Sequence, residues 1–440
     1  MHKNSRKGRF APCGAVLLAA ALGSAALLVA LAGCAKKEAR EGDLTMWTFV
    51  DLHAKFYEAM AERWNEDHPD RQLHITFTNM PYGEMHNKVT MAVQTGKGAP
   101  DLVDIEIGQF PNFLKGTVPF LPLNEYLAPY EADVVKSRLE IYGKDGVYYG
   151  VPTHVGAMVM YYNTALLEAA GIDYKTIVTW DDFTAAGKKY RAATGKTLTT
   201  VDTGGTDWLS LAMAEYGQDW TDEAGRADIK IPSVKKMIEM QAGWIRDGIA
   251  ACSPGGHIDM ETGFANLTAG ELAAFPKALW FMSRFVNYMP EMAGVWAIAP
   301  CPVFEPGQPR SVGVGGTGTV IFANSKSAAL AAEFMAWAKL SWEGNVRIWE
   351  ELGFDPCNTK VWTDTNVTGD ASNKFIAYFK TNPFDTLNQI RNEIGKIRVT
   401  QMSPVIGEQM NINVLVGVLQ DGGDLAAALS EAQAQIDLEQ

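Results

Sequence analysis

Cysteine is scarce in this chain, and no cysteine motif for a metal is present. The 440 residues contain five cysteines, at positions 13, 34, 252, 301 and 357, with no CxxC pair among them. That spacing does not match the cysteine patterns of structural zinc sites. Beyond position 34, we expect either buried thiols or one disulfide among Cys252, Cys301 and Cys357.

Positive charge is also in short supply. The chain has 38 Lys and Arg against 51 Asp and Glu, which gives a formal net charge of −13. A protein that binds nucleic acid is expected to carry a basic face, so this balance argues against a nucleic-acid partner.

The common nucleotide and catalytic motifs are missing. There is no HExxH, GxSxG or EF-hand loop. The letters GVGGTG at 313–318 match a dinucleotide fingerprint, but the following TVIFANS predicts a strand where that fingerprint needs a helix. We therefore interpret these glycines as a tight turn with close backbone approach. The TGKT at 194–197 has Tyr190 where a P-loop has glycine, so no cofactor is implied.

The longest hydrophobic run lies at the N-terminus. Four cations, at positions 3, 6, 7 and 9, precede an apolar run over 15–32 that ends in Leu-Ala-Gly-Cys34. This ending resembles the bacterial lipobox. We expect 1–33 to be a lipoprotein signal peptide, Cys34 a lipidated N-terminus, and 34–42 a tether on the extracytoplasmic face of the bacterial membrane. An uncleaved transmembrane anchor is the alternative, because such a run can cross a bilayer.

The remainder is long enough for two α/β domains. Hydrophobic residues make up 47% of the chain, which is ample for buried cores. Strands are predicted at 44–49, 73–79 and 101–107, and helices at 52–66 and 83–95. This alternation suggests a parallel sheet with helices on both faces. A second such unit is expected from a strand at 157–163 and a helix capped by Thr179. Further on, the pattern predicts a strand at 318–325 and helices at 326–340, 342–352, 404–419 and 424–437.

The stretch MWTFVDLHAKFYEAM, residues 46–60, joins a strand to a helix and carries polar groups at the junction. We expect Asp51 to be the N-cap of the helix, with His53 close by. Ligands bind beyond the carboxyl ends of strands in α/β sheets, so both side chains are candidates to bind ligand hydroxyls. A capping role alone is the alternative for Asp51.

Tryptophan is abundant, with 12 residues, and three stand where we do not expect a core to need them: Trp47, Trp208 and Trp280. A sugar ring packs its C–H face on an indole, while its hydroxyls need carboxylate, amide or imidazole partners. Trp208 and the adjacent Asp207 follow the glycine-rich VDTGGT loop, which favours a binding site there. Core packing is the alternative for each indole.

Residues 43–440 resemble the extracellular solute-binding proteins of ATP-driven sugar importers, the group that includes maltose-binding protein. The landmarks are MWTFVDLHAKF, TGKGAPDLVDI, and YYGVPTHVGAMVMYYNTALLEAAGI followed by TWDDF. Within that group, WTFVDLH, PYGEMHNKV and GAPDLVDIEI look most like the branch that binds arabinose or arabino-oligosaccharides.

The resemblance implies a type II periplasmic-binding-protein fold, with two α/β lobes, a hinge and a ligand cleft between the lobes. Lobe one would comprise 43–154 with 303–350, and lobe two 159–298 with 355–440. The hinge segments would be 155–158, 299–302 and 351–354.

The resemblance also suggests site positions. Asp51, Glu84, Trp208 and Trp280 match or fall near ligand-binding positions of the maltose-type proteins. Gly156, Ile105, Gly108 and Gln109 depart from that type, which argues against maltodextrin, while His154 and Glu106 offer other hydroxyl partners. The predicted ligand-binding residues are Trp47, Asp51, His53, Glu84, Glu106, His154, Asp207, Trp208 and Trp280.

The expected function is therefore non-enzymatic capture of arabinose or an arabino-oligosaccharide by a lipid-anchored monomer that delivers it to ABC permease subunits. Three alternatives remain: a binding protein for another oligosaccharide, a secreted carbohydrate-active hydrolase, and a polyamine-binding protein. A hydrolase would need two carboxylates on either side of a glycosidic bond, and the acids at 101, 104, 106, 181 and 182 leave that open.

Overall fold

The computed structural model describes residues 42–440, and its first part is built on a five-stranded sheet with the order β2-β1-β3-β13-β6. β1 (Asp43–Thr48) pairs in parallel with β2 (His74–Asn79) and β3 (Leu102–Glu106). The predicted parallel arrangement of these three strands is confirmed. β13 (Thr317–Ile321) runs antiparallel to β3 and to β6 (Gly150–Pro152), which the sequence pattern did not indicate.

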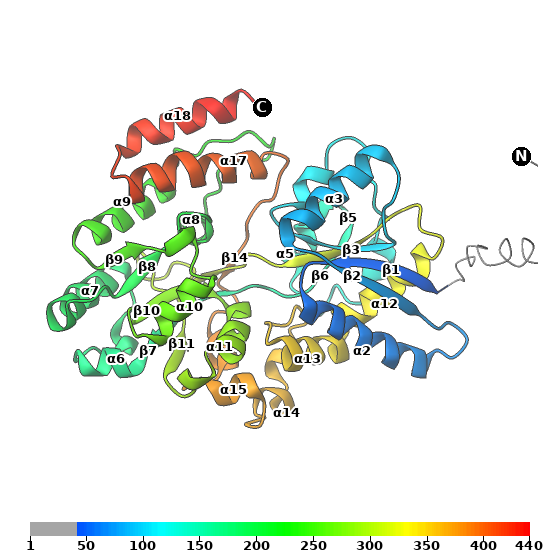
Figure 1. Ribbon diagram of the computed structural model, residues 1–440, viewed down its shortest axis with the longest axis horizontal. Coiled ribbons are helices and arrows are strands. Elements are labelled where there is room, and N and C mark those ends of the chain that lie inside the picture. Colours follow the sequence, from blue (N-terminus) through cyan, green and yellow to red (C-terminus); the bar gives the residue numbers. More distant parts are fainter. Residues whose placement is uncertain (1–41) are drawn as a thin grey trace, which may run out of the picture. The chain divides into compact units, whose positions relative to one another are not determined.

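Helices cover both faces of this sheet. α2 (Asp51–Asp67) and α12 (Ala328–Leu340) lie on one side and α3 (Tyr82–Thr95) on the other (Figure 1). Four of the five residues of β3 are buried, as expected for a strand that is covered on both faces.

The second part contains a three-stranded antiparallel sheet rather than another parallel unit. β7 (Met158–Asn163) lies between β10 (Ala274–Ala278) and β11 (Trp296–Ala299) and is antiparallel to both. The second unit was expected to have parallel strands like the first. That expectation is wrong, because β7 runs antiparallel to both of its neighbours. After about a hundred residues of intervening chain, β10 returns to β7 in the opposite direction. β8 (Thr199–Val201) and β9 (Ala250–Cys252) form a separate parallel pair.

Three predicted helices are present around these strands: α7 (Trp180–Thr194) after Thr179, α17 (Ser403–Gln409) within 404–419, and α18 (Leu425–Asp437) within 424–437. The others are α6 (Thr164–Ala169), α8 (Asp207–Tyr216) and α9 (Pro232–Arg246). Thr179 caps α7 as predicted: its hydroxyl accepts from the Asp182 backbone N–H, and the Asp182 carboxylate accepts from the Thr179 backbone N–H. α17 continues over Met410–Gln420 with π-type hydrogen bonding, a rare geometry often found at functional sites.

Besides short turns of 3-10 and π helix, the described chain contains shorter α-helices and strands. The helices are α4 (Asn124–Leu127), α5 (Lys136–Glu140), α10 (Glu261–Thr268), α11 (Met282–Tyr288), α13 (Trp342–Arg347), α14 (Thr365–Thr368), α15 (Lys374–Tyr378) and α16 (Pro383–Gln389). The strands are β4 (Gly143–Lys144), β5 (Val147–Tyr148), β12 (Ser311–Val312) and β14 (Ile394–Gly395). Within 42–440 no helix has both the length and the apolar character to span a bilayer.

The predicted N-cap role of Asp51 is wrong. α2 starts one residue earlier than expected, so Val50 is the N-cap and Asp51 is the first helical residue, with no side-chain cap. Asn79 at the end of β2 pairs in register with Thr48 of β1, and its side-chain amide donates to the Asp51 carboxylate instead. A carboxylate in the first turn still interacts favourably with the helix dipole.

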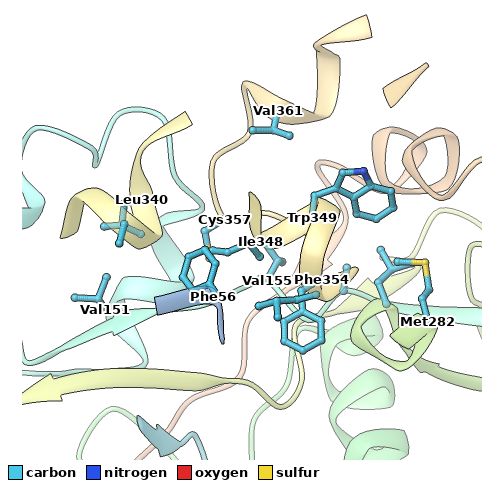
Figure 2. Close-up of a cluster of buried hydrophobic side chains, with 14 of the residues drawn as sticks. Phe56, Val151, Val155, Met282, Leu340, Ile348, Trp349, Phe354, Cys357 and Val361 are labelled. Carbon is cyan, nitrogen blue, oxygen red and sulfur yellow. The ribbon is translucent and has the colours of Figure 1, made fainter. Parts of the chain in front are cut away.

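The largest buried cluster joins elements far apart in the sequence. Figure 2 shows part of it, in which Phe354 lies beside Val155, with Phe56 and Met282 in the same cluster. Cys357 belongs to it as a free thiol, and Cys252 and Cys301 are also free, so no disulfide forms among these three. Cys13 and Cys34 lie outside the described residues, as do the predicted signal peptide and lipidation site.

Two buried side chains, Asp355 and Arg138, each bind backbone groups near the predicted hinge segments. The Asp355 carboxylate accepts from the backbone N–H groups of Gly156 and Ala157, at 3.1 and 2.7 Å. The Arg138 guanidinium donates to the carbonyls of His154, Gly313 and Gly315, at 3.2, 3.3 and 2.6 Å.

The glycine-rich stretch at 313–318 leads into strand β13, so the strand predicted to follow these glycines is confirmed. Gly315 and Gly316 have φ of 64° and 106°, which favours glycine. A Cβ at Gly316 would lie 2.9 Å from the Arg138 guanidinium, so these positions also permit the close approach that was expected.

Candidate functional site

A cavity of about 630 Å³ lies where the carboxyl end of β3 faces the start of α8. Its size is within the roughly 300–1,000 Å³ usual for small-molecule sites. The lining comes from three parts of the chain: Tyr82 with 106–109; 204–207, Ser210, Met213, Asp219, Trp220 and His257; and Val314, Gly315, 397–399, Ser403, Pro404, Gly407, Glu408 and Asn411. Its place beyond a strand end agrees with the general rule for ligands of α/β sheets.

Glu106 is the acid on the β3 side. Its carboxylate oxygen Oε2 accepts from the Gly108 backbone N–H at 2.7 Å and from the Tyr82 hydroxyl at 3.2 Å. Burial raises the pKa of Glu106 to about 7, and the negative charge of Asp207 acts in the same direction. This carboxyl can therefore both donate and accept hydrogen bonds near neutral pH.

Asp207 is the acid on the opposite side, at the first position of α8. The ammonium of Lys277 lies 2.9 Å from its Oδ2 and 3.3 Å from Oδ2 of the buried Asp202. Burial by itself would lower the pKa of Lys277, but the charges of Asp207 and Asp202 outweigh it and raise the pKa. Lys277 thus remains a cation that holds Asp207 in position.

The glycine-rich loop before α8 makes room for an imidazole. A Cβ at Gly204 would lie 2.4 Å from Nε2 of His257, so only glycine fits against this ring without displacing it. Asn411 donates from its side-chain amide to the Gly204 carbonyl at 3.2 Å, which fixes the loop. His257 and Asn411 add hydrogen-bonding groups to the cavity lining.

Aromatic rings are present on both sides of the cavity. Tyr82 is 42% exposed, whereas Trp220 is buried and belongs to the same cluster as Trp208, and both Tyr82 and Trp220 line the space. Trp280 lies next to the lining, where its indole N–H donates to the Val314 carbonyl at 3.4 Å. Rings of this kind can pack against the C–H face of a sugar while the acids bind its hydroxyls.

The structure brings Glu106, Asp207 and Trp280 together, and it places the other two predicted indoles elsewhere. Trp47 is 9% exposed and Trp208 is 5% exposed, and each ring belongs to a buried cluster. Trp208 packs on Trp180 and Trp244, with centroids 5.6 and 5.9 Å away. The expectation that a core does not need these two indoles is therefore wrong, and neither lines the cavity.

His53 and His154, also predicted, are buried outside the cavity lining. Nδ1 of His53 lies 3.1 Å from the buried Asp104 carboxylate. The His154 ring packs on Phe354 at 4.7 Å, and neither of its nitrogens has a hydrogen-bond partner among the described residues. Burial lowers the pKa of His154, and the charge of Arg138 adds to this, so the ring is held neutral.

The two remaining predicted acids are at exposed helix starts. Asp51 opens α2 and Glu84 lies in the first turn of α3, and neither lines the cavity. Their ligand-binding roles stay predictions.

Four residues of the cavity lining were not predicted from the sequence: Tyr82, Trp220, His257 and Arg398. Tyr82 opens a helix and Trp220 follows the end of α8, so both have the neighbourhood of ordinary surface residues. The available signal was the position of Trp220 beside Asp219 in a polar loop, because binding residues are more frequent in loops than in the elements that the loops connect. Arg398 reaches the cavity from a part of the chain almost two hundred residues after α8, which no local pattern reveals.

Comparison with known proteins agrees with this architecture. The family described as "Bacterial extracellular solute-binding protein" matches residues 50–340. The chain is 38% identical over 399 residues to the arabinooligosaccharide-binding protein of Halalkalibacterium halodurans, which covers 90% of this chain and 89% of that protein. It is 35% identical over 401 residues to the arabinooligosaccharide-binding protein of Bacillus subtilis, and this match covers 90% of this chain and 92% of that protein.

Solved structures establish the fold. The galacto-N-biose-/lacto-N-biose I-binding protein of the ABC transporter from Bifidobacterium longum superposes with a TM-score of 0.74 at 22% identity, over 90% of this chain and 97% of that protein. The α/β architecture is thus the two-lobe type II fold of periplasmic sugar-binding proteins, as the resemblance implied. The chain belongs to the bacterial extracellular solute-binding protein family.

Proposed function

We propose that this protein captures an arabino-oligosaccharide outside the cell membrane and delivers it to the permease of an ABC transporter. The observation that carries the proposal is the 38% and 35% identity, over 90% of the chain, to two proteins named for binding arabino-oligosaccharides. Lipid anchoring through Cys34 on the extracytoplasmic face and a monomeric state are part of the proposal.

The chemistry of the cavity supports this ligand class. Glu106, Asp207, His257 and Asn411 offer hydrogen bonds to hydroxyls, and Tyr82 and Trp220 offer apolar ring faces. The lining contains four acids, Glu106, Asp207, Asp219 and Glu408, and one cation, Arg398. Asp207 is already paired with Lys277, and Asp219 accepts from the Arg398 backbone N–H. A polyamine site would instead need several acids without such partners. We propose that the sugar binds in this cavity. Trp280 lies next to the lining, where its indole N–H donates to the Val314 carbonyl.

We further propose that the lobes close on the ligand about the predicted hinge segments. Residues 303–312, first assigned to lobe one, contact the second lobe: Thr179 bridges to Val303, and Arg310 pairs with Glu393 at 2.6 Å. We therefore extend lobe two through residue 312 and keep 43–154 with 313–350 as lobe one. Closure requires that the ligand bind the closed state more tightly than the open one.

Isothermal titration calorimetry with arabinotriose tests the function, and maltotriose is the matched control. We expect saturable binding of arabinotriose and none of maltotriose at the same concentration. Binding of maltotriose alone would instead favour another oligosaccharide as the ligand.

A hydrolase is the second candidate, because Glu106 and Asp207 line one cavity. Incubation with arabinan and with arabinotriose separates the two functions. We expect no new reducing ends over hours, whereas their steady formation, lost in Glu106→Gln, would establish hydrolysis.

A further inference from the structure

An extended segment, residues 394–402, lies between the cavity described above and a second one. The second cavity has a volume of about 580 Å³. The two share five lining residues: Met213, Asp219, Ile397, Arg398 and Val399. Three of the five belong to this segment, which we call the strap.

The strap is attached to the second lobe through Arg398 and β14. The Arg398 backbone N–H donates to the Asp219 carboxylate at 3.0 Å, and its guanidinium donates to the Thr221 carbonyl at 2.7 Å. β14 pairs in parallel with β12, directly before the glycine-rich turn. Residues 396–400 form no regular structure, so these bonds determine where the strap lies.

The strap also contacts elements of the first lobe. Lys396 pairs with Glu140 of α5 at 3.3 Å, and the Gln401 amide donates to the Leu114 carbonyl at 3.3 Å. Ile397 and Val399 pack against the buried cluster that contains Leu114. The strap therefore forms a shared wall of both cavities and is fixed at each side.

The second cavity carries the hydrogen-bonding groups that a sugar needs. Ser137 and Glu140 contribute from α5, Gln218 and Thr221 from the loop after α8, and Lys396 from the strap. The arrangement is polar and of mixed charge, which suits neutral hydroxylated units better than an ion.

Resting on the proposed function, we propose that the two cavities are consecutive parts of one site, and that the second receives the distal units of longer arabino-oligosaccharides beyond the strap. Short chains fill only the cavity beside Glu106 and Asp207. Longer chains pass Arg398 and gain contacts with Ser137 and Glu140. The residues of the second cavity therefore determine the preferred chain length.

Calorimetry with linear arabino-oligosaccharides of two to six units tests this in the full-length mature protein. Wild type should bind with an affinity that rises with length and then levels off. Ser137→Ala keeps the Lys396–Glu140 pair that fixes the strap, so it should weaken the longest chains by about three- to tenfold, the value of one hydrogen bond, and leave the disaccharide unchanged. Glu168→Ala is the control, because this acid forms only a long 3.9 Å pair and lies outside both cavities.

Each outcome decides the matter. An affinity independent of length, or variants that weaken every length by the same factor or none, would overturn the inference while leaving the proposed function intact. If no arabino-oligosaccharide binds at all, the proposed function fails, and this inference fails with it. Thermal unfolding of each variant ensures that a lost affinity does not reflect lost folding.

Discussion

The ammonium nitrogen of Lys277 lies 2.9 Å from the carboxylate of Asp207. The same ammonium lies 3.3 Å from Asp202, which is buried and also accepts from the Ser253 hydroxyl and the Ile258 backbone N–H. The ammonium of Lys277, on β10, thus links the buried Asp202 to Asp207, the acid that faces the cavity. The position of that acid depends on a residue that the ligand need not contact.

The first prediction concerns this pair. Lys277→Met leaves two carboxylates close together without a cation, and the loss of one partner of a buried ion pair costs about 3–5 kcal/mol. We expect a lower free energy of unfolding, at the low end of that range because Asp207 is partly exposed, and weaker sugar binding. Urea denaturation and calorimetry measure the two effects. Lys196→Met, which breaks the exposed pair with Glu271, should change stability by about 1 kcal/mol or less. Equal effects of the two substitutions would contradict the assigned role of Lys277.

The second prediction concerns the exposed aromatic wall. Tyr82→Ala removes a ring from the cavity lining, so sugar affinity should fall by at least about 1 kcal/mol, as for an aromatic contact residue. Tyr288→Ala is the control: this ring is 61% exposed, stacks on Phe264 and lies outside the cavity. Calorimetry that finds both variants binding like wild type would remove Tyr82 from the site.

The third prediction separates packing from binding at Trp208. The ring is buried against Trp180 and Trp244, and truncating a core tryptophan costs about 3–5 kcal/mol. We expect Trp208→Ala to lower the midpoint of urea unfolding sharply, while Trp342→Ala, at a position 45% exposed, changes it little. A Trp208→Ala protein of normal stability that no longer binds sugar would instead restore Trp208 as a direct ligand contact.

The fourth prediction concerns pH. The pKa of Glu106 is raised from 4.5 to about 7, so between these values the folded protein binds more protons than the unfolded chain. Stability must then fall as pH rises through this window. The buried Asp355 and Glu215, each with a pKa raised to about 7 by burial, act in the same direction.

Glu106→Gln tests the contribution of the first group. The amide oxygen can still accept from Gly108 and Tyr82, so the fold should be retained. The amide does not titrate, so the folded protein loses the extra proton that Glu106 binds. We expect a shallower decline of the unfolding free energy between pH 5 and pH 8 than in wild type. An unchanged slope would mean that Glu106 titrates as it does in water.

The first lobe could be predicted in some detail because its elements are local patterns. Alternating apolar residues and turn signals specified β1, β2 and β3 and the helices between them. In the second lobe, Thr179 specified the start of α7. The strands β7 and β13 were also predicted, but their antiparallel pairing was not, because their partners are 100 residues or more away in sequence.

The site was harder to predict, for a related reason. Glu106 was named because it offers a hydroxyl partner where the chain departs from the maltose-type pattern, and Asp207 because it stands beside Trp208 after a glycine-rich loop. Trp208 has the same neighbourhood, yet its ring points into the core, since adjacent residues on a helix face different directions. Trp220, His257 and Arg398 join the cavity only through tertiary folding, which residue types and spacing do not encode locally.

A crystal structure of the protein with arabinotriose tests the central claim most directly. The account predicts sugar in the cavity between β3 and α8, with hydroxyls on Glu106 and Asp207 and a ring face on Tyr82 or Trp220. Sugar bound elsewhere, for example in the groove lined by Tyr174, Lys175 and Lys380, with this cavity free of sugar, would contradict it.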